Sequence, residues 1–177
     1  ADGPLAHVSR ITLLRDSSEI DIRNDINQNF DGTHTWDFNF KLTSPDVWHE
    51  ESGAVIRAKL LAQGGHYSPT MSRLEWLTLN HFADMSGADG AGVTLSNSDL
   101  AFMKLGGSTI VDGVSRLDVE TPTIHVLAGG QIDGPRLGIH RQGGDSHFLN
   151  RFALRTHRGF NAPAAMKFAL EHQNPPV

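Results

Sequence analysis

The chain has 177 residues, of which 38% are hydrophobic and 20% are charged, and its formal net charge is −5. These values are typical of one globular domain with a buried core, and they exclude a disordered or fibrous chain. The acidic balance argues against nucleic acid and anionic lipid as partners, because both need a basic surface. The absence of cysteine excludes disulfides, thiol catalysis and cysteine-type zinc sites.

The sequence predicts neither a signal peptide nor a transmembrane helix. No run of 18 apolar residues predicts a transmembrane helix, and the polar start ADGPLAHVSR does not resemble a signal peptide. These features leave the compartment open. The first residue is Ala1 rather than methionine, which indicates a processed chain or an excised piece of a longer one.

The first third of the chain predicts short strands joined by turns. Strands are expected near 7–15 and 19–26, with a hairpin turn at Asp16-Ser17-Ser18 between them. The clearest pattern runs from His34 to Leu42, where aromatic and aliphatic residues alternate with polar ones. This period of two predicts a half-buried strand with an aromatic inner face. Trp36 lies on that face and is expected to pack in the core.

The remaining sequence continues in the same way and ends in a helix. Further strands are expected over 53–62, 74–85, 92–96, 100–105, 109–119, 123–127 and 148–157. The density of strands and turns predicts an all-β sandwich that forms a single domain over residues 1–177. One short C-terminal helix is expected over 161–173, since Asn161 is a suitable N-cap and Pro163 suits the first turn.

The histidines do not form a recognisable metal motif. There are ten, but no HxH or HExxH pair occurs, so no metal ligand is predicted. A site assembled from separate strands would make the chain a small metal-dependent β enzyme that contains stoichiometric zinc or iron. The histidines are His7, His34, His49, His66, His81, His125, His140, His147, His157 and His172.

Local motifs predict no catalytic residue. Glu50 and Glu51 are adjacent, so on a strand they point to opposite faces and cannot both line one pocket. Trp48 follows a loop-like stretch and is a candidate for an exposed platform that stacks on a sugar ring. A stand-alone carbohydrate-binding module of mutarotase-like fold, using Trp48 or Trp76, is therefore an alternative function.

Five segments together resemble one family, the family 38 glycoside hydrolases, which are retaining α-mannosidases. The similarity lies in their order and spacing and is to the C-terminal β domain of that family, from about Ser18 to Pro176. The segments are SEIDIRNDINQN (18–29), HTWDFNFKL (34–42), ESGAVIRAKLLAQGG (51–65), LTLNHFADMSGADGAGVTLSNSD (77–99) and GDSHFLNRFALRTHRGFNAPAAMKFALEHQNPP (144–176).

The resemblance implies a non-catalytic role for this chain. In the family, the zinc ligands and the nucleophilic Asp belong to an N-terminal barrel domain, which nothing here resembles. The C-terminal domain is a galactose mutarotase-like supersandwich, which would begin upstream of Ala1 and be partial here. Its implied partner is the catalytic N-terminal domain of the same polypeptide, which would hold the zinc. A glycan partner and a homo-oligomer are compatible with the family.

The same resemblance indicates where this chain would approach a sugar. His81, Asp84 and Asp99 flank loops in the best-matching segment, and Trp48 adds the platform described above. Asp and His at turn boundaries also commonly cap local backbone groups, which is the structural alternative for each. No catalytic residue and no metal ligand is assigned to this chain.

Overall fold

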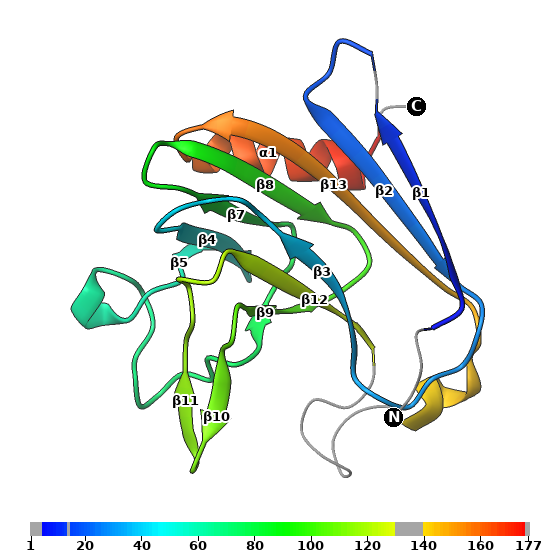
Figure 1. Ribbon diagram of the computed structural model, residues 1–177, viewed down its shortest axis with the longest axis horizontal. Coiled ribbons are helices and arrows are strands. Elements are labelled where there is room, and N and C mark those ends of the chain that lie inside the picture. Colours follow the sequence, from blue (N-terminus) through cyan, green and yellow to red (C-terminus); the bar gives the residue numbers. More distant parts are fainter. Residues whose placement is uncertain (1–4, 14, 130–139, 176–177) are drawn as a thin grey trace.

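The chain folds into two antiparallel sheets that face each other, with one helix at the C-terminal end (Figure 1). The structure, a computed structural model, describes residues 5–13, 15–129 and 140–175. This mostly-β, sandwich-like architecture confirms the all-β class and the C-terminal helix expected from the sequence.

The larger sheet has seven strands and forms the layer next to the helix. Its strands do not follow chain order, because the C-terminal strand pairs between the second strand of the chain and a strand from its middle. In spatial order they are β1 (His7–Leu13), β2 (Glu19–Ile26), β13 (Phe148–Arg158), β8 (Ala91–Asn97), β7 (Phe82–Ser86), β4 (Asp46–Glu51) and β5 (Ala54–Arg57).

The smaller sheet has four strands and covers the middle of the larger one. Its spatial order is β3 (His34–Asn39), β12 (Thr123–Gly129), β9 (Phe102–Leu105) and β6 (Leu77–Thr78). A separate hairpin of β10 (Thr109–Val111) and β11 (Val114–Arg116) projects from the body, and short 3-10 turns occupy η1 (Leu61–Gln63) and η2 (His140–Gly144) (Figure 1).

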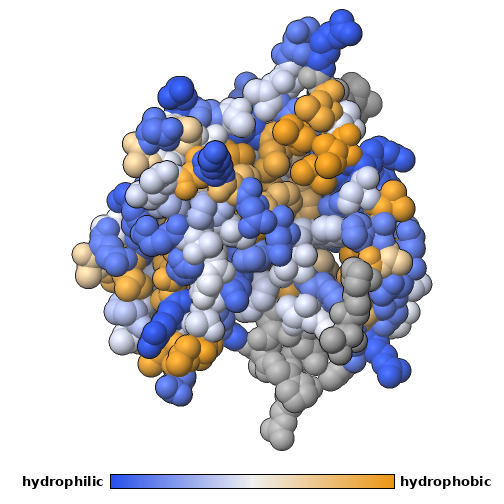
Figure 2. Space-filling view, in the orientation of Figure 1, coloured by the Kyte–Doolittle hydropathy of each residue, from blue (hydrophilic) through white to orange (hydrophobic). Residues whose placement is uncertain are grey.

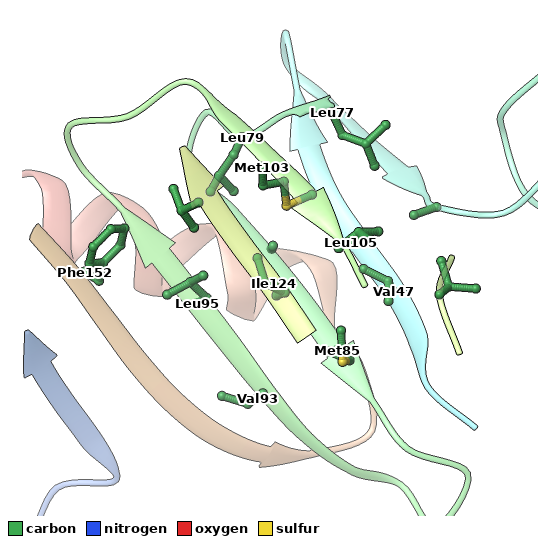
Figure 3. Packing of buried hydrophobic residues seen from close by; sticks show 14 residues of the cluster. Val47, Leu77, Leu79, Met85, Val93, Leu95, Met103, Leu105, Ile124 and Phe152 are labelled. Carbon is green, nitrogen blue, oxygen red and sulfur yellow. The ribbon is translucent and has the colours of Figure 1, made fainter. Parts of the chain in front are cut away.

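The main core lies between the two sheets. Residues directly opposite each other on antiparallel strands point to the same face, so alternate positions of the large sheet form an apolar inner layer. Met85, Leu95 and Phe152 in that layer are fully buried against Met103 and Ile124 of the small sheet (Figure 3). The alternation of apolar and polar residues along the strands of the sequence therefore corresponds to this buried layer.

The predicted aromatic strand is present but shorter than expected. Trp36 and Phe38 pack against the core, and the rings of Phe38 and Phe152 meet edge to face at 5.0 Å. The Phe40 amide still donates to the carbonyl of Pro122, but proline has no N–H with which to return the bond. The ladder therefore ends at Asn39 rather than Leu42.

Three other segments differ from the prediction because turns interrupt them. The expected strand 53–62 is a strand only over Ala54–Arg57 and is followed by η1. The expected strand 109–119 is the β10–β11 hairpin, in which Asp112 and Gly113 both adopt positive φ values of 51° and 76°. That Asp-Gly pair is a typical two-residue hairpin turn. The expected strand 74–85 divides into β6 and β7, because residues 79–81 carry the chain from the small sheet to the large one.

Helix α1 (Ala162–Gln173) packs on the outer face of the large sheet (Figure 1). It begins as predicted, with the side chain of Asn161 accepting a hydrogen bond from the Ala164 amide at 2.9 Å. Ala165 and Ala169 are buried together with Phe82 of β7. In the described ranges, no helix combines the length and apolar character that a membrane span requires.

Candidate functional site

The four predicted substrate-proximal residues all lie on or beside the large sheet, but not in one place. Trp48 in β4 and Asp84 in β7 are paired in register, so both side chains lie on the face that carries α1. His81 immediately precedes β7, and Asp99 follows β8. The structure therefore brings Trp48 and Asp84 together, whereas His81 and Asp99 have separate partners.

Asp84 is the centre of a buried polar cluster. Its side chain is 1% exposed, and it accepts hydrogen bonds from Thr94 Oγ1 at 2.6 Å and Ser86 Oγ at 3.1 Å. His157 Nε2 lies 2.7 Å from Asp84 Oδ2. Burial raises the pKa of Asp84, although these three partners oppose that shift.

Gly92 leaves the space that the His157 ring occupies. A Cβ atom on Gly92 would lie 2.3 Å from Cε1 of His157 and 2.7 Å from Ser86 Oγ. The glycine thus permits the imidazole to lie across β8 and reach the carboxylate in β7. His157 is 73 positions from Asp84, so no local spacing in the sequence signals this pair.

The Asp84–His157 pair can hold a proton, but it lacks the third member of a hydrolytic triad. The buried Nδ1 atom of His157 has no hydrogen-bond partner among the described residues. The two hydroxyls of this cluster, on Ser86 and Thr94, donate to the carboxylate instead of to the imidazole. A serine nucleophile needs a hydrogen bond to its base, so this geometry does not support nucleophilic catalysis.

Trp48 lies within β4 and is half-buried, not in a loop as expected, and it is part of an aromatic stack rather than an isolated platform. Phe160 stacks on the indole with centroids 5.0 Å apart and an interplanar angle of 15°. The Arg57 guanidinium lies 5.6 Å from the indole centroid, and Arg57 also binds Asp46. Stacking of a sugar on Trp48 stays a prediction, and it would have to share the ring with these neighbours.

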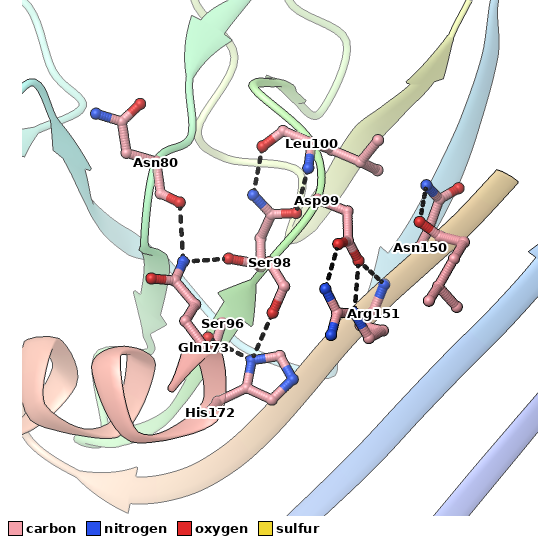
Figure 4. A network of polar contacts seen from close by, with 11 residues as sticks. Asn80, Ser96, Ser98, Asp99, Leu100, Asn150, Arg151, His172 and Gln173 are labelled. Atoms are coloured by element: carbon pink, nitrogen blue, oxygen red, sulfur yellow. Dashed lines mark hydrogen bonds and ion pairs between the residues drawn. The ribbon is translucent and has the colours of Figure 1, made fainter. Parts of the chain in front are cut away.

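His81 and Asp99 each hold a structural contact. Nδ1 of His81 lies 2.6 Å from Oε2 of Glu50, whose side chain is fully buried. Asp99 accepts three hydrogen bonds from Arg151, one from its amide and two from its guanidinium (Figure 4). Both contacts connect a loop to a neighbouring strand, as polar residues at turn boundaries commonly do.

Next to Asp99, the end of α1 is held against β8 by side-chain hydrogen bonds (Figure 4). Nδ1 of His172 lies 2.8 Å from the hydroxyl of Ser96, and burial lowers the pKa of His172. The amide of Gln173 donates to the carbonyls of Asn80 and Asn97. Ser96 is fully buried, so this serine–histidine contact fixes the helix and is not a reactive pair.

An apolar surface remains open at one end of the sandwich. Ile11 and Leu13 in β1 are 61% and 71% exposed, although they share the inner face of the large sheet with Ile20 and Leu154. We call this surface the open inner face. Figure 2 shows it as an apolar area at the upper right, where Figure 1 places β1 and β2.

The open inner face continues into a groove that runs below the small sheet. This groove has a volume of about 640 Å³ and is lined by Ile20, Leu154 and Val93 of the large sheet and by Phe40 and Leu42 beyond β3. At the other end of β1 the same face is closed, because Trp36, Phe30 and Phe148 pack around Ile26 there.

The comparisons with known proteins do not assign this chain. No model of a known protein family matches it, and no curated protein is similar enough in sequence to count as a relative. In the part of the chain that the structure describes, no three His, Asp or Glu side chains are arranged to hold a metal ion.

Proposed function

We propose that this chain is the non-catalytic C-terminal β-sandwich of a family 38-type α-mannosidase, with galactose mutarotase-like topology. The parent enzyme would hydrolyse α-mannosides, with zinc and the catalytic carboxylates in its N-terminal domain. This chain would scaffold that domain and form part of the wall of its cleft. The ordered resemblance from Ser18 to Pro176 supplies the family.

The observation that carries the scaffolding role is the open inner face. Fully burying an aliphatic side chain contributes roughly 1.5–3 kcal/mol, so leaving Ile11 and Leu13 in water forgoes several kcal/mol. Exposed apolar patches of this kind commonly mark interaction surfaces. A scaffold that packs against the rest of its polypeptide has a use for such a face, whereas an independent binding module has none.

The polar clusters support a structural rather than a catalytic role. Asp84, Asp99 and Glu50 are each engaged by partners within the chain. Glycoside hydrolysis requires two carboxyl groups that face the scissile bond across about 5–10 Å of open space. Side chains used to connect strands do not meet that requirement.

The test is an activity assay on the chain and on the complete product of the gene that encodes it. With an aryl α-mannoside and added zinc, we expect no turnover from the chain alone and zinc-dependent turnover from the complete product. Turnover by the chain alone would overturn the non-catalytic assignment. An inactive complete product, or a gene that encodes only this chain, would overturn the parent enzyme.

A further inference from the structure

The strand β3 has a free edge that lies beside the open inner face. It is the terminal strand of the four-stranded sheet and pairs only with β12 in the described residues. The Phe40 amide points toward the β12 side, where it donates to Pro122. In an antiparallel ladder alternate residues point the other way, so the amides of Thr35, Asp37 and Asn39 face the free edge.

The position of β3 shows which part of the large sheet the small sheet leaves uncovered. Phe38 packs on Phe152 at 5.0 Å, and the indole N–H of Trp36 donates to Asn150 at 2.8 Å, so β3 lies over β13. Beyond β13 the large sheet continues for two more strands, β2 and β1. Strands in a sheet are spaced by about 4.8 Å, so two added strands next to β3 would cover that width.

The charges around the groove indicate the chemistry of what covers it. Its polar lining includes Lys41 and Arg158, and no carboxylate is among its lining residues. Acidic side chains on an occupant would pair with these two cations. The apolar floor below requires apolar side chains at every second position of an extended segment.

We propose that an extended segment of the parent polypeptide adds two strands at the free edge of β3, the first of them paired with β3, and so continues the small sheet over β2 and β1. Its alternate apolar side chains cover Ile11, Leu13 and Ile20, and its acidic residues face Lys41 and Arg158. This inference rests on the proposed function, and it specifies that the partner is a β-strand and that β3 receives it.

A strand suits this surface better than a helix or a bare loop would. An apolar helix face can cover Ile11 and Leu13, but its own backbone groups are already bonded within the helix. It would leave the three outward amides of β3 buried without partners, which is unfavourable because each has lost its hydrogen bond to water. An added strand satisfies the same amides and the apolar floor together, as in other cases of strand addition.

Hydrogen–deuterium exchange on the chain and on the complete gene product tests this inference without any substitution. We expect the amides of Thr35, Asp37 and Asn39 to exchange rapidly in the dilute chain and about 100-fold more slowly in the complete product. The Phe38 amide is the matched control, because it already faces β12 and is expected to be protected in both samples.

Side-chain footprinting of Leu13 on the same samples separates the other occupants. Protection of Leu13 without protection of the three amides would indicate coverage by a helix or loop and overturn strand pairing. Protection of the three amides in the complete product that appears only at high concentration would indicate a second copy rather than a segment of the same polypeptide, and would overturn the proposal as well. A gene that encodes only this chain would do the same.

Turnover of the aryl α-mannoside by the same complete product reports on the proposed function separately. Turnover with unprotected β3 amides would reject the strand pairing and leave the enzyme assignment standing. Protected amides without turnover would support the pairing and reject the mannosidase.

Discussion

His49 shows how burial controls the protonation of a single residue in this fold. It is fully buried, with Nδ1 2.8 Å from the Thr78 carbonyl and Nε2 2.8 Å from the Tyr67 hydroxyl. A carbonyl only accepts, so Nδ1 of the neutral ring carries its proton. The Tyr67 hydroxyl, which has a single proton, lies within hydrogen-bond distance of both Nε2 and Oε2 of Glu51, the latter at 3.1 Å. Burial is the main reason that the pKa of His49 falls to about 4, and burial also raises the pKa of Tyr67.

The lowered pKa of His49 makes stability depend on pH in a defined direction. The unfolded chain protonates this histidine near pH 6.5, whereas the folded chain does so only near pH 4. The unfolded state therefore binds more protons between these values, and the free energy of unfolding falls as the pH drops through them, by on the order of 3 kcal/mol.

We expect urea midpoints to decrease between pH 7.5 and 4.5, and we expect the His49→Gln variant to lose much of that decrease. His147→Gln, at an exposed position, should leave the slope unchanged. Equal slopes in all three proteins would contradict this assignment.

Gly92 is the second residue whose role can be isolated. An alanine there would place Cβ against Cε1 of His157 and force the ring away from Asp84. Overpacking of this kind costs about 1–3 kcal/mol, so Gly92→Ala should lower the urea midpoint. Gly107→Ala is the matched control, because its Cβ would meet only an Asp118 oxygen, at 3.2 Å. If the two variants are equally stable, the His157–Asp84 contact does not depend on the space at Gly92.

Among the elements, the ends of α1 are the best defined. The Asn161 side chain satisfies one of the amides that a helix start leaves unpaired. Asn161→Ala should therefore destabilise the protein by about 1 kcal/mol, and Asn161→Asp, which keeps the accepting oxygen, by much less. Urea unfolding of both variants measures the difference. A loss of the same size in both would mean that the cap contributes nothing and that packing alone fixes the helix.

Strand periodicity and turn chemistry were sufficient to predict most elements, and the failures have local causes. The alternation at 34–42 correctly predicts which side of β3 faces the core, because Trp36 and Phe38, two positions apart, both pack against it. The division of 74–85 could not be predicted, since residues of similar polarity serve two different sheets. The Asp112-Gly113 turn divides the segment 109–119, for which the apolar pattern alone predicts a single strand.

The candidate site was less accessible to sequence reasoning than the fold. Trp48 and Asp84 were both singled out, but their register across β4 and β7 depends on pairing that no short motif encodes. In the sequence His157 is one of ten scattered histidines, because its partner Asp84 lies six strands earlier in the chain. Long-range contacts of this kind follow from topology, and topology was predicted here only as a sandwich.

For the molecule as a whole, the mismatch between a seven-stranded and a four-stranded sheet is the dominant feature. The smaller sheet covers the middle strands and leaves β1 and β2 with an apolar inner face. Unpaired terminal strands with exposed apolar side chains promote association between copies. The chain alone combines both properties at β1, so its behaviour in solution should be governed by that strand.

We therefore expect the chain alone to self-associate as its concentration rises, and expect Ile11→Lys to weaken that association at least about tenfold, or ~1.4 kcal/mol. Val8→Lys is a closely matched control, since Val8 is 60% exposed on the same strand but points to the opposite face. Sedimentation equilibrium of the three proteins measures the dissociation constants.

A wild-type chain that stays monomeric would contradict the prediction, because the open inner face would then be stable in contact with water. Equal effects of the two lysines would assign the association to the edge of β1 rather than to its inner face. In the complete gene product the same face is expected to be covered, so Ile11→Lys there should instead lower the stability of the folded protein.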